Sequence, residues 1–164
     1  MNECYPRYDK EYPGMIASAV EKTAKFISGR TNSSNQHTLF AVGHCHIDTA
    51  WLWPYAETKR KIARSWSTQL ELMRQYPDFK FCASQIGQYY WLKKNNPEVF
   101  ERVKAAVAEG RFEVVGGSWV ELDGNVPSGE SMVRQLLYGQ RFAQAEFGKR
   151  IEVFFLPDTF GYSP

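Results

Sequence analysis

The feature that most constrains this chain is a regular alternation of short apolar segments with longer amphipathic ones. Four apolar segments of strand length recur, and helical patterns fill the intervals between them. These segments are residues 38–43, 79–84, 111–115 and 152–156. Strands that alternate with helices are typical of a parallel sheet with right-handed crossovers. The sequence therefore predicts an α/β fold, with its first strand buried on both faces.

Helical periodicity and capping residues mark the intervals. Residues 57–76 carry apolar side chains at helical spacing, and Pro77 follows them directly. Residues 96–109 open with an asparagine and a proline, which suit the N-cap and the first helical position. Residues 129–147 follow a serine and end before a glycine, which indicates a helix with both ends defined.

The first part of the chain differs in character from the rest. A short amphipathic helix is predicted over residues 16–27, and residues 29–37 have the polar composition of a linker. We therefore expect residues 1–36 to form a helical and irregular appendage with a linker, and residues 37–164 to form the main domain.

Composition argues against several classes of function. The net charge is +2 and no basic run occurs, so nothing indicates a nucleic-acid partner. No stretch approaches the roughly 20 apolar residues of a membrane span, and the N-terminus lacks the apolar core of a secretion signal. Cys4, Cys45 and Cys82 are odd in number and scattered, which favours a reducing compartment. We expect a cytoplasmic protein without a membrane association.

Polar side chains gather just after the predicted strands. In parallel α/β folds, the carboxyl ends of the strands meet at one edge of the sheet, where function is concentrated. The residues predicted to lie at this carboxyl edge are His44, His46, Asp48, Gln85, Glu121, Asp123 and Asp158. Most of the groups that could perform chemistry therefore share one edge.

The segment after the first strand is the most specific of these groups. Successive residues of an extended chain point to opposite sides, so His44, His46 and Asp48 share one face while Cys45 and Ile47 share the other. Imidazole nitrogens and a carboxylate suit a divalent metal such as zinc. The alternative is a pair of capping or hydrogen-bonded histidines. Cys45 is predicted to be a buried, inert thiol rather than a ligand.

The remaining candidates each have a structural alternative. Asp158 follows an apolar strand at a turn, where it would either act chemically or form an Asx turn or helix cap. Trp51 would either lie in the core or form the floor of a sugar site, because apolar sugar faces stack on aromatic rings. Glu121 and Asp123 would bind sugar hydroxyls or belong to a solvated loop.

Three segments resemble the glycoside hydrolase family 38 α-mannosidases. They are residues 41–53 (AVGHCHIDTAWLW), 112–135 (FEVVGGSWVELDGNVPSGESMVRQ) and 155–164 (FLPDTFGYSP), and the form resembles the cytosolic class that trims free oligosaccharides. The resemblance implies a seven-stranded parallel β/α barrel, of which this chain would hold the first four βα units. It also implies an α-mannoside oligosaccharide as substrate and is compatible with a homo-oligomer of a full-length parent.

The resemblance also implies roles for individual residues. His46 and Asp48 match a metal-ligand pair, and Asp158 matches the nucleophile, which also contacts the metal. The implied cofactor is one divalent ion, zinc or cobalt, that binds mannose hydroxyls. Trp51 matches a ring beside the bound mannose, where Asp48 and Asp158 also contact the sugar. His44 matches a residue that is not a ligand and would orient its neighbours through a hydrogen bond.

The implied mechanism is a two-step displacement with retention, in which Asp158 forms a covalent glycosyl-enzyme that water hydrolyses. In the family, the acid/base residue and one further histidine ligand occur later than residue 164, so we expect little or no activity from the truncated chain alone. Two alternatives stay open. In the first, His44 and His46 form the paired-histidine motif of a metal-dependent amidohydrolase or deacetylase. In the second, the chain is a non-catalytic fragment that binds metal or sugar weakly.

Overall fold

The computed structural model describes residues 12–29 and 38–162, and the chain divides into two compact units between Leu39 and Phe40. In the first unit, helix α1 spans Tyr12–Ser28 and contains the predicted helix over residues 16–27. Residues 1–11, including Cys4, and residues 30–37 of the predicted appendage and linker lie outside the described residues. Within the described ranges, no helix combines the length and the apolar composition needed to cross a membrane.

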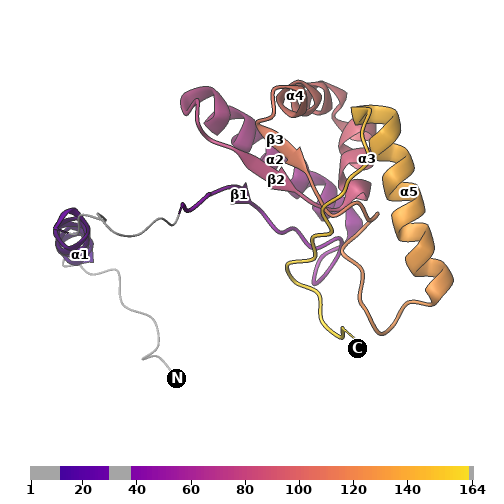
Figure 1. Ribbon diagram of the computed structural model, residues 1–164, viewed down its shortest axis with the longest axis horizontal. Coiled ribbons are helices and arrows are strands. Elements are labelled where there is room, and N and C mark those ends of the chain that lie inside the picture. The colour runs from indigo at the N-terminus through magenta and orange to yellow at the C-terminus, as the bar shows by residue number, and fades with distance from the viewer. Residues whose placement is uncertain (1–11, 30–37, 163–164) are drawn as a thin grey trace. The chain divides into compact units, whose positions relative to one another are not determined.

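The second unit is built on a small parallel sheet (Figure 1). Its strands are β1 (Gly43–His44), β2 (Phe81–Ala83) and β3 (Phe112–Val114), which lie side by side in the order β1-β2-β3. Gly43 is opposite Phe81, and Phe81 is opposite Phe112, so all three strands run the same way in register. The predicted α/β class with parallel strands is therefore confirmed.

Four helices accompany the sheet, and α5 runs beside α3 in Figure 1. Their bounds are α2 Tyr55–Gln75, α3 Ile86–Asn95, α4 Pro97–Ala108 and α5 Gly129–Phe147. The local signals explain the ends of the last two. Pro97 occupies the start of α4, and the Ser128 hydroxyl accepts a hydrogen bond from the Ser131 N–H at the start of α5. Gly148 ends α5 with a φ of 68°, a conformation that glycine adopts without strain.

A cluster of aromatic rings forms the core between the sheet and the helices. The Trp66 ring centroid lies 4.4 Å from that of Tyr89 and 5.6 Å from that of Phe112, and Phe112 packs edge-on against Phe81 at 5.2 Å. All four side chains are almost completely buried. Such large rings contribute roughly 2–3 kcal/mol each through burial alone, so they hold the strands firmly against α2 and α3. The packed core thereby fixes the carboxyl ends of the strands, from which the candidate site residues extend.

The first strand differs from its prediction. The segment over residues 38–43 was expected to be buried on both faces, but β1 begins only at Gly43, and Phe40 and Val42 are exposed, Phe40 by 93%. The physical reason is that β1 lies at the edge of this sheet and pairs with β2 alone. An edge strand has no second neighbour to cover its side chains or complete its hydrogen bonding.

The fourth predicted strand, residues 152–156, is not a strand in the structure. The Gly116 N–H donates a hydrogen bond of 2.8 Å to the Val153 carbonyl, which brings this segment beside the end of β3. A strand requires a repeating ladder of such bonds. Gly116 and Gly117 have φ values of 85° and 70°, so the chain turns out of the extended conformation directly after β3 and the ladder ends.

Candidate metal centre

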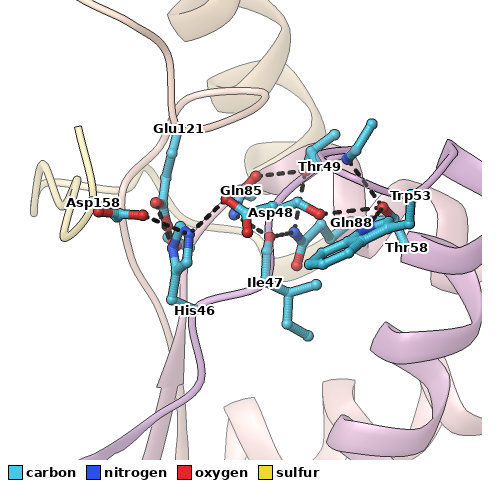
Figure 2. A network of polar contacts seen from close by, with 12 residues as sticks. His46, Ile47, Asp48, Thr49, Trp53, Thr58, Gln85, Gln88, Glu121 and Asp158 are labelled. Carbon is cyan, nitrogen blue, oxygen red and sulfur yellow. Dashed lines mark hydrogen bonds and ion pairs between the residues drawn. The ribbon is translucent and has the colours of Figure 1, made fainter. Parts of the chain in front are cut away.

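Three of the predicted site residues meet at the carboxyl edge of the sheet (Figure 2). His46 and Asp48 follow β1, and Asp158 comes from the turn after residues 152–156. His46 Nε2 lies 3.1 Å from Asp48 Oδ1 and 3.5 Å from Asp158 Oδ2. One ligand atom from each side chain lies within 4.8 Å of the other two. The structure thus brings together two segments that are far apart in the sequence.

The chemistry of these three atoms fits a divalent cation. Two carboxylate oxygens and a ring nitrogen at these distances repel one another unless a proton on the nitrogen or a metal cation lies between them. One nitrogen and two oxygens form a donor set that zinc and cobalt accept, and three protein donors leave positions for a substrate. The Asp158 side chain is 54% exposed, so the cluster is open to solvent on its side.

Behind the cluster, a buried acid contacts the far nitrogen of the same imidazole. Glu121 Oε2 lies 2.8 Å from His46 Nδ1, and the Glu121 side chain is only 5% exposed. The Ser84 hydroxyl donates a hydrogen bond of 2.5 Å to Glu121 Oε1. The sequence predicted Glu121 at this edge as a candidate for sugar hydroxyls. In the structure, Glu121 is instead buried against His46. The one sequence signal for a role of Glu121 was its position after β3.

Two glutamines position the loop that carries the ligands (Figure 2). Gln85 Nε2 and Gln88 Nε2 donate hydrogen bonds of 2.8 and 2.7 Å to the Ile47 carbonyl. The Thr49 hydroxyl donates to Gln85 Oε1 at 2.5 Å. Gln85 has a φ of 62°, a left-handed conformation that is costly for a residue other than glycine and is often found at functional sites. The buried amides at the start of α3, from its N-cap residue Gln85 and from Gln88, therefore hold the backbone on both sides of Asp48.

His44 is not part of the cluster of His46, Asp48 and Asp158. Its ring packs edge-on against Phe155 at 4.9 Å, and its Nε2 atom is buried without a hydrogen-bond partner among the described residues. Burial lowers the pKa of His44, and the electrostatic interaction with the nearby His46 ring lowers it further. The paired-histidine arrangement that an amidohydrolase requires is therefore not formed by these two side chains.

The other predicted side chains are more exposed. Trp51 is 66% exposed, and its ring lies edge-on to Trp53 at 5.4 Å. Trp53 also lines a pocket of about 200 Å³ beside His46 and Asp48, whereas Trp51 does not. Asp123 accepts hydrogen bonds from two backbone N–H groups of its own loop, which lower its pKa. For Asp123, the solvated loop is the interpretation that the structure supports.

The sequence of the chain is similar to those of known proteins. The model of the glycosyl hydrolases family 38 N-terminal domain matches residues 36–164. The chain belongs to this family. It is 54% identical to alpha-mannosidase G of Dictyostelium discoideum over 90% of the chain. It is 50% identical to human alpha-mannosidase 2C1 and 54% identical to alpha-mannosidase of Saccharomyces cerevisiae, each over 99% of the chain.

The family relationship extends to solved structures. The crystal structure of an alpha-mannosidase from Enterococcus faecalis V583 matches with a TM-score of 0.64 and 30% sequence identity. The match covers 72% of this chain and 13% of that one. The matches to the three curated relatives likewise cover only 14–15% of each relative's length.

Proposed function

We propose that this chain supplies the metal-binding and nucleophile-bearing part of a retaining α-mannosidase. Such an enzyme removes terminal α-linked mannose from oligosaccharides, and we place it in the cytoplasm. The observation that carries the proposal is the convergence of His46, Asp48 and Asp158 at the carboxyl edge of the sheet. Membership of a family whose relatives are named alpha-mannosidases supports it.

In this proposal, His46 Nε2 and one oxygen each of Asp48 and Asp158 hold one zinc or cobalt ion. The bound ion supplies Lewis acidity that orients mannose through its hydroxyls. Asp48 and Asp158 also face the bound sugar, and the exposed Trp51 ring provides an apolar surface for stacking against it. His44 stays outside the ligand set and packs behind the loop against Phe155.

Asp158 is the nucleophile. One of its oxygens forms a bond to the anomeric carbon while the bond to the leaving oxygen breaks, and a general acid gives that oxygen a proton. Water, which gives its proton to the same group, then displaces Asp158 and releases mannose with retained configuration. The exposure of Asp158 suits this role, because substrate and then water must reach the same carboxylate.

Neither acid of the loop after β3 is free to be the acid/base. Glu121 is buried against His46, and Asp123 accepts two hydrogen bonds from its own loop. In this proposal, the acid/base is therefore neither of these two side chains. We infer that the chain alone has little mannosidase activity, and that its sheet forms the beginning of a seven-stranded β/α barrel in a longer enzyme.

A chimera tests this function. The matching segment of the Saccharomyces cerevisiae relative, which aligns with 99% of this chain, is replaced by residues 1–164. We expect the chimera to hydrolyse an aryl α-mannoside in the presence of zinc or cobalt, and the isolated chain to show almost no turnover. Asp158→Asn should reduce the turnover of the chimera by at least about a thousandfold, because the nucleophile is lost. A folded chimera without activity would contradict the proposal.

A trapping experiment then separates the glycosidase from the amidohydrolase alternative. A fluorinated mannoside should leave a covalent sugar ester on the chimera, in the peptide that contains Asp158, as mass spectrometry detects. An amidohydrolase uses a metal-bound water and forms no such ester. An active chimera with no label, or with the label on another peptide, would remove Asp158 from the nucleophile role.

A further inference from the structure

Both nitrogens of the His46 ring contact carboxylates, and the two sides differ sharply. Nε2 faces Asp48 and Asp158 in the open cluster, whereas Nδ1 faces Glu121 in the interior. Nδ1 and Glu121 Oε2 lie 2.8 Å apart, and neither atom has a well-aligned hydrogen bond to any described residue. Two buried polar atoms in this position need only a small rotation of the ring to form a direct N–H to O bond.

The burial of Glu121 requires an explanation. A carboxylate that is 5% exposed is costly unless hydrogen-bond donors or a positive charge compensate it. The Ser84 hydroxyl compensates one oxygen, and the other oxygen is directed at His46. A proton on His46 Nδ1 would give Glu121 Oε2 the hydrogen-bond donor that it lacks. The same acid cannot reach a sugar in the open cluster, because the His46 ring and its own burial separate it from the exposed side.

We propose that Glu121 is a positioning residue for the metal ligand His46. By accepting the Nδ1 proton, Glu121 selects the tautomer in which the Nε2 lone pair is free and directs it towards Asp48 and Asp158. Ser84 holds Glu121 in place for this contact. Outer carboxylates of this kind orient metal-bound histidines and raise their basicity. The inference rests on the metal site proposed above, and it adds Glu121 and Ser84 as the residues that hold the ligand His46 in position.

Metal affinity provides the first test, with the full chain. Glu121→Gln keeps the size of the side chain but removes its charge. We expect the dissociation constant for Zn²⁺, measured by competition with a chromophoric chelator, to rise about 10- to 100-fold. The visible absorption of bound Co²⁺ should also change, because it reports the geometry of the ligand nitrogen. The matched control is Asp123→Asn, which removes an acid two residues away whose hydrogen bonds, among the described residues, are to N–H groups of its own loop.

The control should bind Zn²⁺ within about twofold of the unmodified chain, a difference too small to indicate a lost ligand contact. Ser84→Ala should weaken binding less than Glu121→Gln, and the double variant should be no weaker than Glu121→Gln alone, because Ser84 acts through Glu121. Equal losses in Glu121→Gln and Asp123→Asn, or no loss in Glu121→Gln, would overturn the proposal.

A second measurement needs no metal and separates this proposal from the function itself. The chain has 3 histidines, so long-range ¹H–¹⁵N spectra at about pH 8, where an ordinary imidazole is neutral, can be assigned from single variants. His46 Nε2 is also 3.1 Å from Asp48 Oδ1 and 3.5 Å from Asp158 Oδ2, so the spectra are recorded on a chain that carries Asp48→Ala and Asp158→Ala, in which Nε2 faces neither carboxylate. In this background we expect His46 to carry its proton on Nδ1, and Glu121→Gln to shift the population towards Nε2–H. An Nε2–H tautomer in the chain with Asp48→Ala and Asp158→Ala would overturn the role of Glu121. Zn²⁺ binding that survives Asp48→Asn and Asp158→Asn would instead overturn the metal site.

Discussion

Replacing Thr58 with valine should loosen the connection between the metal-binding loop and helix α2. The Thr58 hydroxyl accepts hydrogen bonds from the Ala50 N–H at 3.0 Å and from Trp53 Nε1 at 3.1 Å, and it donates to the Asp48 carbonyl at 3.2 Å. Its side chain is fully buried. Valine has nearly the same shape, so the change removes three hydrogen bonds without opening a large cavity.

The magnitude follows from these contacts. An intramolecular hydrogen bond contributes about 1 kcal/mol net, and a buried donor left without a partner costs about 1–3 kcal/mol. Ala50 has a φ of 62°, so its backbone cannot easily turn its N–H towards another acceptor. Trp53 is only partly buried, and its N–H can reach water. We therefore expect Thr58→Val to lower the free energy of unfolding by about 2–3 kcal/mol.

Thr58→Ser is the matched control, because it keeps the hydroxyl and removes one methyl group. The loss of a buried methyl costs about 1 kcal/mol. Equilibrium urea denaturation followed by circular dichroism measures both variants against the unmodified chain. We expect Thr58→Val to lower the free energy of unfolding by about 1–2 kcal/mol more than Thr58→Ser does. If Thr58→Val were as stable as Thr58→Ser, the hydroxyl network would not be what holds this loop.

Two further predictions concern the burial of Tyr89 and the close packing of α5 at Gly139. Burial, together with the nearby Cys82 and Glu113, raises the pKa of the Tyr89 phenol well above its ordinary value, so the unfolded phenol ionises first. The free energy of unfolding should therefore fall as the pH rises past about 10, and Tyr89→Phe should reduce this slope in pH-dependent urea titrations. Gly139→Ala should destabilise the chain in thermal melts although alanine favours helices, because its methyl group would collide with the Gly117 carbonyl. A stabilised Gly139→Ala variant would contradict this account of how α5 packs.

Much of the second unit could be predicted from local patterns. Hydrophobic periodicity located α2, and the cap residues Ser128 and Gly148 located both ends of α5. These signals act over a few residues, since they concern which side chains share one face and which backbone groups need partners. The grouping of polar residues after the strands followed from the same patterns and predicted His46, Asp48 and Asp158 at one edge.

Length and pairing of the strands could not be predicted in the same way. Apolar composition over residues 38–43 and 152–156 is compatible with a strand, but a strand exists only where a neighbour supplies hydrogen bonds. At the start of the sheet, β1 has one neighbour, and after β3 the turn at Gly116 and Gly117 ends the ladder. These facts depend on segments that are distant in the chain.

The sequence by itself determined the alternation of strands and helices, the chemistry of the candidate ligands and the edge at which they lie. Only the tertiary structure decided which of them meet: His46 between Asp158 and Asp48, with Glu121 buried behind it, while His44 packs against Phe155. The physical reason is that residue type and spacing specify what a side chain can bind, whereas a distance of 3 Å between side chains of different segments depends on how the core packs the elements that carry them.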